Sequence, residues 1–353
     1  MKDQDCRLTF FRGYCQRKKK HYEKICAGVA EQVAPFLFHI CIVADECAAV
    51  KTYLRNLALN ATLRTMKGII VAAGYGTRFL PVTKTIPKEM IPLVNVPSIQ
   101  FIVDEFVNSG ITDIVIISSR RKKVLEDYFD REVELESVFE REGKKKQLET
   151  IAPPKANIAF VRQQRMMGTG HALLQVKSWI GNDACVVAYP DDLHIGKTPL
   201  ASQLVKAYDE TGCSVLASIT EPGDVSRYGV LAIAKDGKHV SGIVEKPAKG
   251  SEPSHEVSIG RYLYTPEFFT LLEEGWLLHL EAAEKAGRGP GEYFHIYALN
   301  KLMEAGKVVF CQTEGERLDT GEPAGYLDAV LRYADTVPEF RSVIEKFIAS
   351  RKL

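Results

Sequence analysis

The sequence predicts an α/β fold with a doubly wound, mostly parallel but mixed sheet and an inserted hairpin subregion. Short apolar runs alternate with helical patterns from Lys67 to Thr220, which is typical of parallel strands covered by helices on both faces. Beyond Tyr228, strand patterns follow one another across a tight turn, which predicts antiparallel pairing. Of the 353 residues, 46% are hydrophobic and 26% are charged, and these values exclude a largely disordered, collagen-like or coiled-coil chain.

In the parallel part, residues 68–73 form a continuous apolar run, as expected for a strand buried on both faces. Residues 98–109 are expected to be helical because Ile102 and Phe106 share one face, and Gly110 follows as a typical helix stop. Further strands are predicted at 113–118, 157–161, 184–188 and 214–219, further helices at 122–129 and 198–211, and an exposed, charged helical stretch at 130–150.

The second part of the body has a different pattern. Residues 230–234 and 239–244 are predicted to form a hairpin around Asp236-Gly237, a favoured pair for a tight turn. Strands at 257–264 and 308–312 and helices at 322–334 and 338–350 complete the expected elements.

The first 65 residues differ in composition from the rest. They carry 11 Lys and Arg against 6 Asp and Glu, a net charge of +5, whereas the remainder has a net charge of −4. They also hold five of the eight cysteines. We therefore predict an N-terminal extension at 1–65, a catalytic domain at 66–335 and a C-terminal helix at 336–353. A start codon assigned too far upstream, with Met66 as the working start, is the simpler interpretation of the extension. A regulatory or partner-binding arm is the alternative.

Several function classes are excluded by composition. No run of about 18 apolar residues exists, so no membrane-spanning helix is expected. The net charge of +1 gives no overall field toward nucleic acid or an anionic membrane. The cysteines of the first 65 residues show no Cys-x-x-Cys spacing, so a zinc site is not expected there. The body contains three scattered cysteines, Cys185, Cys213 and Cys311, which favours the cytoplasm. We expect a cytoplasmic homo-oligomer that binds neither nucleic acid nor membrane.

A glycine-rich loop follows the first predicted strand. Glycines at Gly74 and Gly76 would let backbone amides approach a phosphate, while Arg78 and Lys88 place two cations just beyond them. A loop with two cations suits a nucleoside triphosphate, whose leaving pyrophosphate must be neutralised. A nicotinamide-dependent oxidoreductase is the alternative, but the third glycine of the dinucleotide fingerprint is replaced by Phe79.

The extended string around this loop resembles a known family. Ala72-Ala73-Gly74-Tyr75-Gly76-Thr77-Arg78, followed by Ile86-Pro87-Lys88-Glu89-Met90, is similar to the bacterial UTP–glucose-1-phosphate uridylyltransferases, a branch of the sugar-1-phosphate nucleotidylyltransferases. The resemblance covers roughly 66–335 and implies a Rossmann-like nucleotidyltransferase fold. It also implies that Arg78 and Lys88 hold the triphosphate. The implied nucleotide-binding residues are Ala72, Ala73, Gly74, Gly76, Thr77, Glu89, Gln163 and Gly168.

The resemblance also implies a metal site and a sugar site. Tyr189-Pro190-Asp191-Asp192 follows a buried strand, at the sheet edge where open α/β sheets bind ligands. Asp191, with Asp319 as a second carboxylate, is the implied ligand set for Mg²⁺, which proteins hold by one or two carboxylates together with phosphate oxygens. The residues implied to contact the sugar hydroxyls are Gly229 and Glu245. Lys246 is implied to meet the sugar phosphate.

Two departures from the family pattern affect the expected sugar site. His255 replaces an Asn of the family, and Phe294 and Tyr297 replace its Gln and Asp. The nucleotidyl chemistry is therefore better supported by the sequence than the choice of sugar.

From these motifs we predict Mg²⁺-dependent transfer of UMP from UTP to glucose 1-phosphate, which yields UDP-glucose and pyrophosphate. The expected ligands are UTP and a sugar 1-phosphate. The alternatives are the same chemistry with a thymidine nucleotide or another sugar, and a non-catalytic nucleotide-sugar sensor on the same fold.

Overall fold

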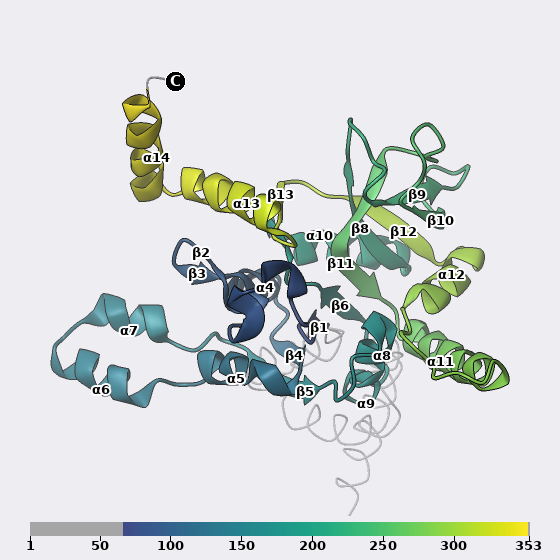
Figure 1. The fold of residues 1–353 in the computed structure, drawn as a ribbon, viewed down its shortest axis with the longest axis horizontal. Helices are drawn as coiled ribbons and strands as arrows, with labels where there is room; N and C mark the ends of the chain where they lie inside the picture. The colour runs from purple at the N-terminus through teal and green to yellow at the C-terminus, as the bar shows by residue number, and fades with distance from the viewer. Residues whose placement is uncertain (1–65, 352–353) are drawn as a thin grey trace, which may run out of the picture. The chain divides into compact units, whose positions relative to one another are not determined.

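The computed structural model describes residues 66–351 (Figure 1). The prediction of an extension at 1–65 lies outside the described residues. Within the described part of the chain, no helix is both long enough and apolar enough to cross a membrane.

A nine-stranded sheet forms the centre of the described domain. Its path runs β10-β9-β11-β6-β1-β4-β5, with β8 beside β11 and β12 beside β8. The strands are β1 (Lys67–Val71), β4 (Asp113–Ser118), β5 (Asn157–Arg162), β6 (Cys185–Ala188), β8 (Ser214–Thr220), β9 (Gly229–Ile233), β10 (Val240–Glu245), β11 (Glu256–Tyr264) and β12 (Val308–Gln312).

The central strands are parallel, and antiparallel pairing begins at β11. Strand β1 pairs in parallel with β4 and β6, and β4 with β5. Strand β11 runs antiparallel to β6, β8 and β9. The mixed sheet predicted from the sequence is therefore confirmed. So is the hairpin, because β9 and β10 pair antiparallel and Gly237 donates a 3.0 Å hydrogen bond to the Ala234 carbonyl across the turn.

Alternate residues of the central strands enter two separate cores. Ile69 faces one core and Ile70 the other, and both are fully buried. Helices α4 (Ser98–Asn108), α5 (Val124–Phe129) and α10 (Leu200–Thr211) pack against one face (Figure 1). Helices α8 (Gly168–Leu174), α9 (Lys177–Ile180), α11 (Glu267–Lys285) and α12 (Ile296–Glu304) cover the other. Burial on both faces explains the continuous apolar runs in the sequence.

The excursion at 130–150 is helical and exposed, as expected. It consists of α6 (Val133–Arg141) and α7 (Lys145–Ile151), neither of which has a buried residue. The chain closes with α13 (Pro323–Thr336) and α14 (Pro338–Ser350), and α14 extends away from the sheet (Figure 1). No residue of α14 is buried, and Val343 and Phe347 lie exposed on it.

A buried ion pair connects α4 to β11. The Arg261 guanidinium donates to both Glu105 carboxylate oxygens at 2.9 Å, and the two side chains are almost fully excluded from solvent. Glu105 also accepts the Ala201 amide at 3.1 Å, and Arg261 donates to the Asp192 carbonyl at 3.2 Å. Through the bond from Arg261 to the Asp192 carbonyl, this cluster holds the segment that carries Asp191 and Asp192 in place.

Candidate active site

The glycine loop after β1 presents free backbone donors. Gly76 has a φ of 69°, which glycine adopts at no steric cost, and the Thr83 hydroxyl donates to its carbonyl at 2.7 Å. None of the amides of residues 74–78 donates a hydrogen bond to another described residue. The space beside Gly74 is open. A loop with unpaired amides and a fixed turn is suited to bind a phosphate.

Lys88 and Asp191 come together beside this loop. Lys88 begins the 3₁₀ turn Lys88–Met90, and its ammonium donates to Asp191 Oδ2 at 2.7 Å. Burial raises the pKa of the Asp191 carboxyl, but the Lys88 ammonium and then Arg78 outweigh burial, so this pKa lies below its ordinary value. The carboxylate is therefore held in its charged form.

Asp319 joins Asp191 through a short strand pair. Strand β7 (Asp192–Ile195) pairs antiparallel with β13 (Glu316–Asp319), and Thr320 donates its amide to the Asp191 carbonyl at 2.8 Å. A Cβ placed on Gly321 would lie 3.1 Å from Asp319 Oδ1, 3.7 Å from Asp191 Oδ2 and 3.6 Å from Arg78 Nη1. Both carboxylates and the guanidinium therefore surround one glycine.

These groups border one cavity of about 420 Å³. Arg78, Asp191 and Asp319 all line it. Lys88 does not line it but donates a hydrogen bond to Asp191. The other lining residues are Tyr189, Asp192, Arg227, Tyr228, Gly260, Arg317, Gly321 and Glu322.

Asp192 has a structural role despite standing beside Asp191. The Arg317 guanidinium donates to its two oxygens at 2.7 and 2.9 Å, and the Gly260 amide donates at 2.8 Å. Its lone pairs are therefore largely occupied, whereas Asp191 accepts from Lys88 alone among the side chains that the structure describes.

The predicted base-binding residues lie at adjacent strand ends. The backbone N–H of Ala72 donates to the Ile117 carbonyl at 2.9 Å, and the backbone N–H of Gln163 donates to the Ser118 carbonyl at 2.9 Å. The ends of β1, β4 and β5 therefore meet. The buried Gln163 side chain donates to the Gly168 carbonyl at 3.1 Å. Gly168 has a φ of 87°, and a Cβ there would lie 2.4 Å from the Tyr293 carbonyl oxygen, so only glycine fits.

Glu89 lies in an environment that the sequence did not indicate. Both of its carboxylate oxygens accept from the Lys122 ammonium, at 2.7 and 2.8 Å, and the residue is only 1% exposed. Burial lowers the pKa of Lys122, and the charge of Glu89 opposes this effect. The structure thus shows a buried ion pair below the loop, and the predicted contact of Glu89 with the base stays a prediction.

The predicted sugar residues lie on the β9–β10 hairpin. A Cβ on Gly229 would lie 2.9 Å from Glu245 Oε2, so these two residues are neighbours. Lys246 has a φ of 49°, an uncommon left-handed conformation for a side-chain-bearing residue, and its amide donates to the Tyr228 carbonyl at 2.9 Å. Its side chain is exposed and does not line the cavity. The structure therefore brings Arg78, Lys88, Asp191 and Asp319 together. Lys246 lies outside the cavity, and its backbone bonds Tyr228, which lines the cavity.

Comparison with known proteins identifies the family. Residues 67–336 match the sequence model described as "Nucleotidyl transferase". The chain belongs to the nucleotidyl transferase family. The match spans the whole described sheet and ends at the C-terminus of α13.

Curated relatives within this family are similar over most of the chain. A protein named UTP--glucose-1-phosphate uridylyltransferase from Staphylococcus haemolyticus (strain JCSC1435) is 39% identical over 288 residues, which cover 80% of this chain and 96% of that protein. One named UTP--glucose-1-phosphate uridylyltransferase 2 from Staphylococcus saprophyticus (strain ATCC 15305) is 37% identical over 293 residues, covering 81% and 98%.

Solved structures share the fold. A UTP-bound UGPase from Acinetobacter baumannii superposes with a TM-score of 0.71 at 30% identity, over 80% of this chain and 98% of that one. A UDP-glucose pyrophosphorylase complexed with UDP-glucose gives a TM-score of 0.64 at 34% identity, over 77% and 99%. The predicted Rossmann-like nucleotidyltransferase fold is therefore confirmed.

The sequence prediction missed a polar network behind the nucleotidyl transferase site. Thr169 Oγ1 lies 3.0 Å from His295 Nδ1, and the Tyr189 hydroxyl lies 3.5 Å from the same nitrogen. This network links the N-terminus of α8 to the segment before Asp191. At the two positions that depart from the family pattern, Phe294 is exposed, and the Tyr297 hydroxyl donates to Glu274 at 2.8 Å.

His295 makes the stability of the domain depend on pH. Burial lowers the pKa of His295 to about 4 from 6.5, so between these values the unfolded chain binds a proton that the folded chain does not. Stability is therefore lost as pH falls through this window, by about 2 kcal/mol at pH ~5. We expect His295→Leu to remove most of this loss, measured as the difference in unfolding free energy between pH 7 and pH 5. An unchanged difference in His295→Leu would contradict the prediction.

Proposed function

We propose that this nucleotidyl transferase is a UTP–glucose-1-phosphate uridylyltransferase, which converts UTP and glucose 1-phosphate to UDP-glucose and pyrophosphate. One observation carries the proposal: Arg78, Asp191 and Asp319 line one cavity, and the Lys88 ammonium bonds Asp191 beside a loop of free amides. The names of the relatives and the ligands of the UGPase neighbours support the choice of UTP and glucose.

In the proposed reaction, a phosphate oxygen of glucose 1-phosphate attacks the α-phosphorus of UTP. The bond from the α-phosphorus to the bridging oxygen breaks, and pyrophosphate leaves with the electron pair. No general base is needed because the attacking phosphate is already ionised, so the protein supplies positioning and neutralisation of charge. Arg78 and Lys88 would hold the triphosphate, and Lys246 would guide the attacking phosphate.

The carboxylates present suit a divalent cation. Mg²⁺ prefers hard oxygen ligands and is bound by one or two carboxylates together with substrate phosphates, and Asp191 and Asp319 both face Gly321. When bound there, Mg²⁺ would neutralise phosphate charge. We propose Asp191 and Asp319 as its ligands.

The remaining predicted roles follow the same arrangement. Gln163 and Gly168 would read the uracil edge with Glu89, and the glycine loop would bind the phosphates through its amides. Gly229 and Glu245 would contact the sugar hydroxyls. We also propose that the enzyme acts in the cytoplasm as a homo-oligomer, and that residues 1–65 lie outside the catalytic domain.

The decisive experiment is a pyrophosphate-release assay with Mg²⁺ and a panel of nucleoside triphosphates and sugar 1-phosphates. We expect turnover to be highest with UTP and glucose 1-phosphate. Preference for thymidine triphosphate would indicate a thymidylyltransferase. Tight UTP binding without pyrophosphate release would indicate a nucleotide-sugar sensor. The same assay on a chain beginning at Met66 tests whether residues 1–65 are needed.

Removal of the Lys246 ammonium should impair turnover much more than stability. Lys246→Ala is expected to lower kcat/KM for glucose 1-phosphate by about 100-fold, because one charge opposite the attacking phosphate is lost. The melting temperature should stay within about 2 °C of the parent, since the side chain is exposed. Lys249→Ala, in the same exposed loop, is the matched control and should keep the parental kcat/KM. Near-parental turnover in Lys246→Ala would reject the role.

A further inference from the structure

The side-chain amide of Gln163 is oriented by two neighbours. Gln163 follows β5 and is only 4% exposed, and its side-chain nitrogen lies 3.1 Å from the Gly168 carbonyl oxygen and 3.1 Å from His171 Nδ1. A carbonyl oxygen can only accept a hydrogen bond, so the atom beside Gly168 must be the NH₂ group of the amide. The amide therefore cannot turn over without losing its bond to Gly168.

His171 accepts the second N–H of this amide. Burial lowers the pKa of the His171 imidazole, so the ring is neutral at pH 7 and one of its nitrogens is free to accept. The other ring nitrogen, Nε2, lies 3.4 Å from the side-chain nitrogen of Gln175, which also donates to the His171 carbonyl at 3.1 Å. Only one nitrogen of a neutral ring accepts. The shorter contact, with an amide whose orientation Gly168 fixes, assigns this role to Nδ1.

The same orientation leaves the Gln163 side-chain oxygen available. No residue between 66 and 351 donates a hydrogen bond to Gln163 Oε1, and this atom is not sealed from solvent. Both N–H groups of the amide are already used. At the C-terminal end of β5, Gln163 therefore presents an acceptor and no donor.

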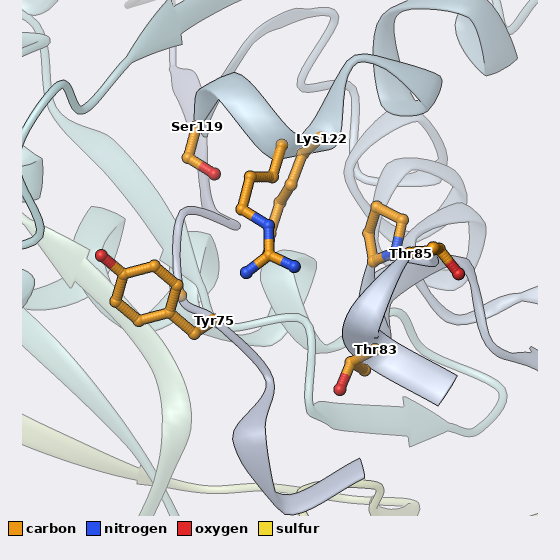
Figure 2. Close-up of a pocket in the computed structure, with 8 residues that line it drawn as sticks. Tyr75, Thr83, Thr85, Ser119 and Lys122 are labelled. Carbon is orange, nitrogen blue, oxygen red and sulfur yellow. The ribbon is translucent and has the colours of Figure 1, made fainter. Parts of the chain in front are cut away.

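This acceptor lies close to the glycine loop. The backbone N–H of Gln163 donates to the Ser118 carbonyl at 2.9 Å, at the end of the neighbouring strand β4. The next residue, Ser119, lines a small cavity together with Gly74 and Tyr75 of the glycine loop. Figure 2 shows Tyr75 and Ser119 among the side chains around this cavity. A base at the end of β5 would thus lie beside the loop that is proposed to bind its phosphates.

We propose that His171 is a positioning residue for base selection, which acts by holding the Gln163 amide so that its oxygen faces the base. Uracil and thymine carry an N3–H donor that this oxygen can accept. The N3 atom of cytosine is itself an acceptor, so it would face the Gln163 oxygen without a hydrogen bond, which is costly in a buried site. The inference rests on the proposed function, which places Gln163 at the uracil edge. His171 acts through Gln163 and transfers no proton.

The test replaces His171 by residues with and without an acceptor. His171→Phe keeps a ring but cannot accept, and His171→Leu is a second acceptor-free variant if the phenylalanine ring does not fit. His171→Asn carries a side-chain oxygen at about the position of Nδ1 and should restore the acceptor. His279→Phe is the matched control. Both histidine rings pack on Trp276, with centroids at 5.4 and 5.7 Å, but of the two only His171 bonds Gln163 in the described chain.

The readout is the preference for UTP over CTP, measured on the full chain in two ways. The Kd of UTP is measured by calorimetry and that of CTP by competition against UTP. The kcat/KM of each nucleotide is measured by pyrophosphate release with glucose 1-phosphate. We expect His171→Phe to lower both preferences by about fivefold or more, because one hydrogen bond no longer orients the amide. His171→Asn should recover most of the loss, and His279→Phe should stay within about twofold of the parent.

A double variant tests whether the effect passes through Gln163. In a Gln163→Leu background, His171→Phe should change the preference by less than about twofold, since no amide remains to be oriented. The proposal is overturned if the acceptor-free variants keep the parental preference, if His279→Phe lowers it equally, or if the effect persists without Gln163. A parent that binds UTP but releases no pyrophosphate would refute the proposed function instead, and the two Kd values would still decide on His171.

Discussion

Asp191→Asn is expected to lower kcat by about 1,000-fold while leaving the fold nearly intact. The substitution keeps the shape of the side chain but removes the charge that meets Lys88 at 2.7 Å and Arg78 nearby. An amide is also a much poorer ligand for a divalent cation than a carboxylate. The measurement is kcat at saturating UTP and glucose 1-phosphate over a Mg²⁺ titration, together with thermal unfolding.

Asp192→Asn is the matched control for this prediction, because it removes one negative charge from the adjacent residue. Asp192 is bound by Arg317 and by the Gly260 amide, so its loss should appear mainly in the unfolding free energy, by about 2 kcal/mol. Retention of kcat within tenfold in Asp191→Asn would contradict the metal and phosphate role of Asp191. A loss of stability in Asp191→Asn as large as in the control would show that the carboxylate serves the fold instead.

The sequence predicted the part of the site that lies at the ends of buried strands. Arg78, Asp191 and Gln163 each follow an apolar run, and the C-terminal ends of parallel strands meet at one edge of a sheet. The structure places all three at that edge, within the segments that contact one another there. A strand pattern and its following polar residue are local features, so a single sequence contains this information.

Contacts between distant segments could not be predicted in the same way. Glu89 finds Lys122, which is 33 residues away, and Glu105 finds Arg261, which is 156 residues away. Each partner alone looks like an ordinary surface charge, because burial depends on how helices and loops pack against the finished sheet.

Helix α11 was also missed. Its apolar residues, among them Leu271, Trp276 and Leu278, spread around the helix instead of forming one stripe.

The short strands β7 and β13 were missed for a related reason. They have four residues each and include Asp192, His194 and Arg317, so they lack the alternation that marks a half-buried strand. They pair antiparallel over four residues, and Arg317 of β13 also donates to the Asp192 carboxylate of β7. Asp319, which we propose as the second metal ligand, is the last residue of β13 and pairs with Asp192 of β7.

The buried pair Glu105–Arg261 should dominate the stability of the domain. Arg261→Met is expected to lower the unfolding free energy by about 3–5 kcal/mol, since it leaves the Glu105 carboxylate buried without its partner. Arg261 is 0% exposed, and its loss also removes its bonds to the Gly260 and Asp192 carbonyls. Urea unfolding followed by tryptophan fluorescence measures the change.

A double variant separates the cost of an unpaired charge from the value of the pair itself. Glu105→Leu with Arg261→Met replaces both charges by apolar groups of similar size, and should recover much of the loss because neither ion then remains buried alone. The recovery is incomplete, because Glu105 also accepts the Ala201 amide, which would lose its partner. The exposed pair Lys301–Glu304 is the comparison, and Lys301→Met should change stability by less than about 1 kcal/mol. If Arg261→Met proves no more destabilising than Lys301→Met, then solvent reaches the pair and it cannot fix the segment that carries Asp191.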